Sequence, residues 1–153
     1  MQIADNRVRL EWLILCDSAE IAGNKLYMLG GGWDVLTVND LPATHHLAIA
    51  VSFKVPWGAT NQKHDVTLAL VNEDTSETLM NLSGQFETGR PPGIPPGSTQ
   101  RAQLAFGLGM RFETTGLFII RCTIDSQEQV EDQVPFRVVA GPLLAAKQRP
   151  PSS

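Results

Sequence analysis

The chain has 153 residues, of which 42% are hydrophobic, so it has the length of one ordinary domain and enough apolar material for a buried core. Only 18% are charged and the net charge is −4, which excludes the basic surface that a nucleic-acid partner requires. The apolar run from Trp12 to Cys16 is too short for a signal peptide, and no stretch approaches the ~20 apolar residues that span a bilayer. We expect a cytoplasmic protein without nucleic-acid or membrane partners.

Strand-like runs recur along the whole chain. In the clearest, His46–Val55, apolar Leu47, Ile49, Val51 and Phe53 alternate with small or polar residues, which predicts a half-buried strand. Turn-forming segments separate the runs, and the only helical piece expected is about one turn at residues 57–63. We predict about nine strands, at Leu10–Asp17, Leu26–Leu29, Trp33–Val38, His46–Val55, Val66–Val71, Met80–Phe86, Ala102–Met110, Phe118–Ile124 and Val134–Val139.

This pattern predicts an all-β fold, an antiparallel two-sheet β-sandwich, because a single sheet would leave its apolar face in water. The ending "TTGLFIIRCTID" to "VPFRVV" is similar to the closing hairpin of immunoglobulin-like and fibronectin-like modules, which favours Greek-key connections. We expect a partly ordered segment at 1–8, one sandwich domain at 9–140, and a disordered Pro/Ser-rich tail at 141–153.

The segments "LCDSAEIAGNKLYMLGGGWD", "GRPPGIPPG" and "TTGLFIIRCTID" to "PFRVV" resemble a bacterial family of unknown function over roughly residues 8–140. That resemblance implies a small antiparallel β-sandwich and brings no established activity and no catalytic residue.

The segment "GRPPGIPPG", residues 89–97, lies in a gap of about fifteen residues between two strands, which is long for a compact domain. Its two Pro-Pro pairs fix the backbone and its glycines let the chain turn, so we expect an ordered arm. The arm is either a rigid crossover that covers an edge strand or a binding element. Proline rings stack on indoles, so the candidate binding residues are Trp33, Trp57, Arg90, Pro91, Pro92, Ile94, Pro95 and Pro96. Trp12 lies on an alternating strand and is expected in the core.

Motifs for catalysis and cofactors are absent from the sequence. There is no Gly-x-Ser-x-Gly run, and "GGGW" at 30–33 lacks the lysine and following helix of a phosphate-binding loop, so we interpret it as a bulge or bend. Cys16 and Cys122 lie in strands where a thiol would be buried and inert, although a cross-sheet disulfide between them stays open. We expect no cofactor, no metal and no enzymatic activity.

The interpretation that follows is a protein-interaction or self-assembly module that uses the proline-rich loop, an edge strand, or both, with a homo-oligomer as one form. One alternative is a module for a small ligand or metal that uses His64, Asp65 and the acidic loops, whereas the adjacent His45 and His46 point to opposite faces and could not chelate together. The second is a hydrolytic enzyme with a dispersed site. The acidic residues that could gather at one end of the sandwich are Asp74, Asp125, Glu128, Glu131 and Asp132.

Overall fold

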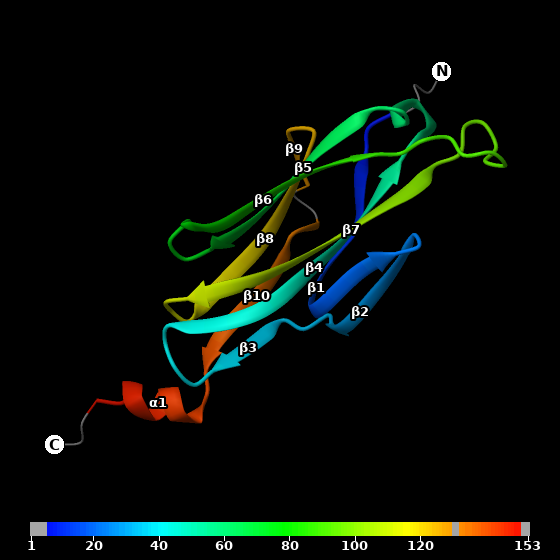
Figure 1. The fold of residues 1–153 in the computed structure, drawn as a ribbon. Helices are drawn as coiled ribbons and strands as arrows, with labels where there is room; N and C mark the ends of the chain where they lie inside the picture. The colour runs from blue at the N-terminus through cyan, green and yellow to red at the C-terminus, as the bar shows by residue number, and fades with distance from the viewer. Residues whose placement is uncertain (1–5, 130–131, 151–153) are drawn as a thin grey trace.

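The computed structural model describes residues 6–129 and 132–150, and in this part of the chain two β-sheets pack face to face (Figure 1). The first sheet has the strand order β2-β1-β4-β7, and the second has the order β3-β10-β8-β5-β6 with β9 paired to β8. The elements are β1 (Arg9–Ala22), β2 (Lys25–Gly31), β3 (Val35–Val38), β4 (Ala43–Val55), the 3-10 turn η1 (Trp57–Ala59), β5 (Lys63–Asn72), β6 (Thr78–Glu87), β7 (Gln100–Phe112), β8 (Gly116–Ile124), β9 (Gln127–Glu128), β10 (Val134–Ala140) and α1 (Pro142–Gln148).

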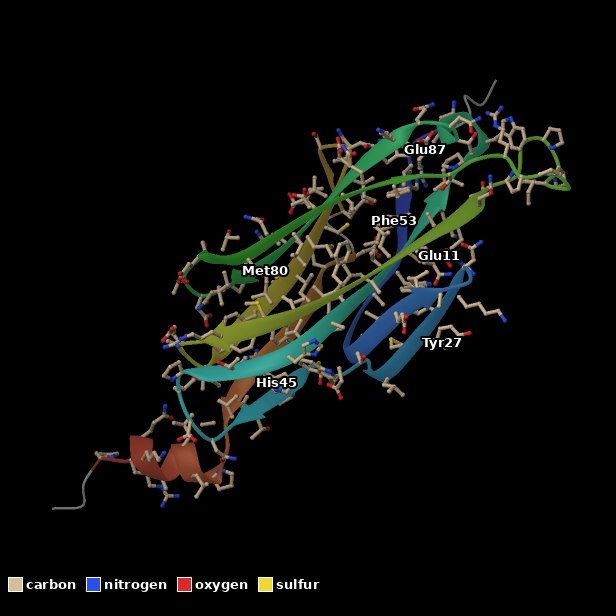
Figure 2. The ribbon with its side chains drawn as sticks, viewed as in Figure 1. Glu11, Tyr27, His45, Phe53, Met80 and Glu87 are labelled. Carbon is tan, nitrogen blue, oxygen red and sulfur yellow. The ribbon has the colours of Figure 1, made fainter. Side chains whose placement is uncertain are left out.

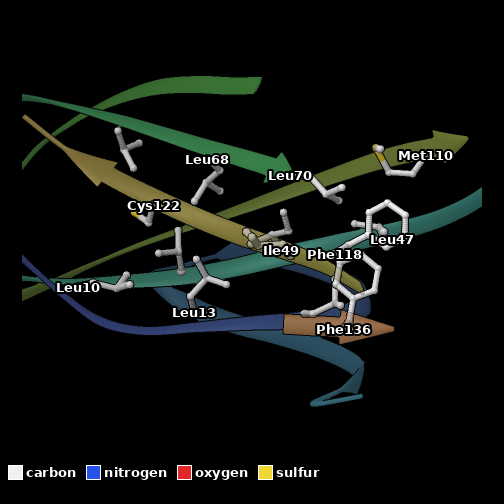
Figure 3. Close-up of a cluster of buried hydrophobic side chains, with 14 of the residues drawn as sticks. Leu10, Leu13, Leu47, Ile49, Leu68, Leu70, Met110, Phe118, Cys122 and Phe136 are labelled. Atoms are coloured by element: carbon white, nitrogen blue, oxygen red, sulfur yellow. The ribbon is translucent and has the colours of Figure 1, made fainter. Parts of the chain in front are cut away.

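The hydrophobic core lies between the two sheets (Figure 3). Stacked and edge-on aromatic pairs join the layers: Phe53 of β4 stacks on Phe86 of β6 with centroids 4.7 Å apart, and Phe112 of β7 meets Phe118 of β8 at 5.2 Å. Such pairs add to the free energy gained by burying the rings themselves. The core residues come from both inner faces, so neither sheet could bury its apolar face alone.

All nine predicted runs form strands, so the mostly β fold with two sheets is confirmed. A tenth strand, the two-residue β9, lies where we predicted only a turn. One pair departs from the antiparallel prediction, because β3 runs parallel to β10. These two strands are distant in sequence, so no tight hairpin constrains their direction. The immunoglobulin-like Greek-key arrangement stays a prediction.

The prediction that Trp12 belongs to the core is wrong. The register of β1 against β4 shifts between Leu10 and Trp12, which is the signature of a β-bulge. After the bulge Trp12 lies opposite Ser52, whose side chain points away from the core, and Trp12 is only half-buried. A one-residue shift exchanges the two faces of a strand, so alternation counted along the sequence gives the wrong side here.

The second half of β1 and all of β2 form a two-stranded ribbon, residues 17–31, which we call the hairpin arm. β1 pairs with β4 only as far as Cys16 and from there pairs with β2 alone. The arm folds back along the outer face of its own sheet (Figure 1), and its tip residues Ile21 and Asn24 reach the start of β7. It covers β4, where Ala48 and Ala50 are at most 1% exposed. β4 is therefore buried on both faces, not half-buried as its alternation predicted.

The expected disordered tail at 141–153 is corrected by α1, which forms Pro142–Gln148. Proline at the first helical position is pre-organised for a helix, and Leu144 is buried against the core, so the helix has both a start signal and a packing partner. Of the expected N-terminal segment 1–8, only residues 6–8 lie in the described part. No helix in residues 6–129 and 132–150 is long and apolar enough to cross a membrane.

Candidate functional site

The proline loop, residues 89–97, consists of two similar turns in tandem. The amide of Ile94 donates to the carbonyl of Pro91 (3.3 Å), and the amide of Ser98 donates to that of Pro95 (3.2 Å). The third residue of each turn is a glycine with positive φ, +92° at Gly93 and +83° at Gly97. Proline followed by a glycine of positive φ is the sequence of a type II turn, so each Pro-Pro-Gly unit specifies its own turn.

All four prolines of the loop are exposed, while Ile94 is half-buried. The loop extends beyond the ends of β6 and β7 at one end of the sandwich (Figure 1). It therefore does not lie along an edge strand as the rigid-crossover interpretation requires.

Arg90 anchors the base of the loop on Trp57. The guanidinium carbon lies 4.1 Å from the centroid of the Trp57 ring, Nη2 donates to the Trp57 carbonyl (2.8 Å), and Nε donates to the hydroxyl of Thr60 (2.6 Å). A planar guanidinium can stack and donate along its edge at the same time, which a lysine cannot do. Trp57 therefore holds the base of the loop through Arg90.

Trp33 does not lie with the other predicted binding residues. It packs edge-on against Phe136 (5.8 Å between centroids) and His45 (6.2 Å), near the first residues of β4. Trp57 follows the last residue of that strand. Ten residues of strand at about 3.3 Å each separate the two ends by roughly 30 Å, and Figure 2 shows His45 and Phe53 in correspondingly distant parts of β4. Trp33 therefore lies far from the loop, and the candidate binding residues Trp33 and Trp57 do not form one group.

A cleft of about 530 Å³ lies beside the proline loop. Ile21 and Asn24 from the tip of the hairpin arm form one wall, and Phe86 to Gly89 and Gln100 to Gln103 form the others. Arg101 is already neutralised, because its Nε and Nη2 donate to the Glu11 carboxylate at 2.6–3.1 Å. That hydrogen bond from Arg101 lowers the pKa of Glu11. The cleft is thus lined by amides, backbone groups and the Glu87 carboxylate, and its arginine, Arg101, is paired with Glu11.

The hairpin arm carries the exposed apolar side chains that sequence reasoning missed. In the described part of the chain five large hydrophobic side chains are exposed, and three of them are consecutive in β2: Tyr27 (57%), Met28 (37%) and Leu29 (73%). Tyr27 lies on the outer surface of the arm in Figure 2. The sequence signal was the run "LYML" between a turn and three glycines, which we interpreted only as a strand.

β2 is also an edge strand, so among the described strands none pairs with the far side of its backbone. Gly23 and Asn24 have φ of +56° and +61°, typical of a two-residue type I′ turn, which makes Ala22 and Lys25 the closing hydrogen-bonded pair. Along an antiparallel pair of strands, hydrogen-bonded positions alternate with non-hydrogen-bonded positions, so Leu26 and Met28 are not hydrogen-bonded to β1. The N–H and C=O groups of Leu26 and Met28 therefore point away from β1, toward the free edge.

Both ring nitrogens of His64 already have hydrogen-bond partners, so the ring is not free to bind a metal ion. The ring is 5% exposed, with Nδ1 2.7 Å from the Asp125 carboxylate and Nε2 2.7 Å from the Ala59 carbonyl. Both partners are acceptors, so the arrangement favours the protonated imidazolium, in which both ring nitrogens donate. Burial lowers the pKa of His64, but the Ala59 carbonyl and the Asp125 carboxylate raise it, and the net shift is upward. A metal at His64 would have to displace one of these bonds.

The acidic loops do not all gather at one end of the sandwich. Asp74 lies two residues after the end of β5, whereas Asp125 follows the last residue of β8, and these two strands are antiparallel neighbours. Their ends therefore lie roughly 20 Å apart. Glu131 lies outside the described residues. Within residues 6–129 and 132–150, no three His, Cys, Asp or Glu side chains are grouped so that they could hold a metal ion.

Both cysteines are free thiols and are fully buried. Cys16 donates to the Ala48 carbonyl (3.4 Å), and burial raises the pKa of Cys122 to about 12. A thiol with a raised pKa is a poor nucleophile, so neither cysteine has the environment of a catalytic residue.

The conserved profile of a family of unknown function, DUF6941, matches residues 11–139 of the chain. The chain belongs to this family. The match begins within β1 and ends within β10, so it includes the hairpin arm, the proline loop and most of the core. No curated protein matches the chain.

Two solved structures match the chain at low similarity. One is a beta-glucosidase from Listeria innocua in complex with isofagomine, with 12% identity and a TM-score of 0.40 over 88% of this chain. The chain spans only 16% of that protein. The other is a structural genomics target, SoR45, with 11% identity and a TM-score of 0.33, covering 99% of this chain and 96% of that one.

Proposed function

We propose that this member of the DUF6941 family is a non-enzymatic assembly module of the cytoplasm, and that it self-associates through the free edge of β2 in the hairpin arm. The observation that carries the proposal is the exposure of Tyr27, Met28 and Leu29 on an edge strand. Natural edge strands are normally short, charged or covered, because an open edge invites pairing with another chain.

The other sheet edges support the choice of β2 by contrast. β3 is only four residues long, and β7 has arginines, Arg101 and Arg111, near its two ends. The exposed side chains of β6 are polar. The only charged residue of β2 is Lys25, at its first position. Of the four edges in the described part of the chain, β2 therefore has the longest run of exposed apolar side chains, and its single charge lies at its first position.

The area available predicts weak association. Three partly exposed side chains supply on the order of 300 Å² of apolar surface per copy, so a pair would bury roughly 600 Å² in addition to backbone contacts. This is below the ~1,200 Å² of stable specific interfaces. Association should therefore depend on concentration.

Sedimentation velocity over a concentration series tests the proposal. The native chain should show a weight-average sedimentation coefficient that rises with concentration. Leu29→Lys should remain a monomer because it places a charge on the edge of β2. The matched control is Leu143→Lys, which changes a side chain of similar exposure (66%) on α1 and should associate like the native chain. A native chain that stays monomeric at millimolar concentration would refute self-association.

The proline loop remains a second predicted contact surface. Its support is the exposure of Pro91, Pro92, Pro95 and Pro96 on a rigid double turn that Arg90 anchors. Replacing the four prolines with serine in the sedimentation experiment separates its contribution from that of β2.

A further inference from the structure

We infer that the partner on the β2 edge is a second copy of this chain, paired antiparallel about a two-fold axis at Met28, so that the two hairpin arms join into one four-stranded sheet. This inference rests on the proposed self-association and adds the register and symmetry of the contact. Three independent properties of β2 select this register.

The first property is the direction of the backbone groups. A two-fold axis perpendicular to a sheet pairs residues on the same face, so the paired residue numbers must differ by an even number. Met28 already directs its N–H and C=O to the free edge, as the turn at Gly23 and Asn24 dictates. Two Met28 residues can therefore exchange both hydrogen bonds as a closely spaced pair.

The second property is the side-chain match that results. With Met28 opposite itself, Tyr27 of each copy lies opposite Leu29 of the other, and this pair is the non-hydrogen-bonded kind in which side chains are closest. Tyr27 and Leu29 are the two most exposed residues of β2, at 57% and 73%. Aromatic and aliphatic side chains directly opposite each other stabilise a sheet. The contact occurs twice by symmetry.

The third property is charge. The same register places Lys25 opposite Gly31, so the only charged residue of β2 does not meet its own copy. A register shifted toward the turn, with the axis at Leu26, would place Lys25 of each copy opposite Tyr27 of the other and remove Leu29 from Tyr27. A register shifted the other way would pair the positive-φ Gly30 with itself and remove Leu29 from Tyr27.

Disulfide trapping tests the register. Met28→Cys should give a covalent dimer with oxidised glutathione, because opposed Cα atoms in a hydrogen-bonded pair lie about 5.5 Å apart, within disulfide range. Leu26→Cys is the matched control, since its copies would be four residues out of register, roughly 13 Å apart. We expect at least tenfold more covalent dimer from Met28→Cys. Cys16 and Cys122 are fully buried and should not react.

The outcomes separate the inference from the proposed function. A native chain that associates and loses association in Leu29→Lys, but whose Met28→Cys variant gives no more dimer than Leu26→Cys, would overturn the register and leave self-association standing. A native chain that is always monomeric, together with an untrapped Met28→Cys, would overturn both. Circular dichroism of the reduced variants confirms that each is folded before trapping.

Discussion

Asp125→Asn should destabilise the protein because it weakens the charged hydrogen bond between Asp125 and His64. Asp125 accepts from His64 Nδ1 at 2.7 Å and from the amide of Asp65 at 2.9 Å. Asparagine is nearly isosteric and tolerates the φ of +48° at this position, so the backbone should not change. The variant therefore removes the negative charge facing a buried imidazolium and little else.

The expected loss follows from the exposure of the pair. A hydrogen bond between charged groups contributes about 1.5–3 kcal/mol to stability. The Asp125 side chain is 42% exposed, and solvent screening places the value near the lower limit, about 1.5 kcal/mol. For a chain of this length that corresponds to a decrease of roughly 5 °C in melting temperature.

The loss should depend on pH in a defined direction. The folded-state pKa of His64 is raised, so the stabilisation is fully present below about pH 6.5, the unfolded value, and is lost as the pH rises through the folded value. Urea unfolding of both proteins from pH 5.5 to 8.5 should show the largest difference at the acidic end. Asp65→Asn, which removes a nearby charge without a bond to His64, is the control. An Asp125→Asn deficit that is absent at pH 6, or that grows with pH, would refute the reasoning.

Two further predictions concern the hairpin arm and the loop anchor. Gly30→Ala should lower the free energy of unfolding in urea by at least about 1 kcal/mol more than Gly32→Ala does. Both substitutions place a Cβ atom at positive φ. At Gly30 that atom would lie 2.7 Å from Cγ of Asp17, whereas at Gly32 nothing lies within 4 Å. Equal losses of unfolding free energy would show that the Asp17 side chain moves aside without cost. Arg90→Ala should cost about 1 kcal/mol through the lost stack on Trp57 and the lost donors, and Arg90→Lys should recover little of it, since lysine keeps the charge without the planar fork. A Lys variant as stable as the native chain would mean that charge alone holds the loop.

Much of the fold could be predicted from local patterns. The alternation in His46–Val55 located β4 within a few residues, and the turn residues between runs located the ends of most strands. The short turn expected at residues 57–63 appears as η1. The tandem Pro-Pro-Gly turns were predicted as ordered because proline and glycine restrict φ through their own covalent structure.

The candidate site was predicted only in part. Arg90 and Trp57 do meet, but Trp33 lies at the far end of β4, because the order of strands in a sheet cannot be read from their individual patterns. The exposed edge of β2 was missed for a related reason. A short apolar run is equally compatible with a buried strand and with an exposed edge, and only its neighbours distinguish the two.

The sequence by itself determined the strands, the turns and the rigidity of the proline loop, since these depend on residues within a few positions of one another. Only the tertiary structure decided which face each strand buries and what covers it. The bulge in β1 turned Trp12 out of the core, and the arm folded back over Ala48 and Ala50, whose small side chains let it approach. Both outcomes depend on contacts between segments distant in the chain, and such contacts leave no periodic signal in either segment alone.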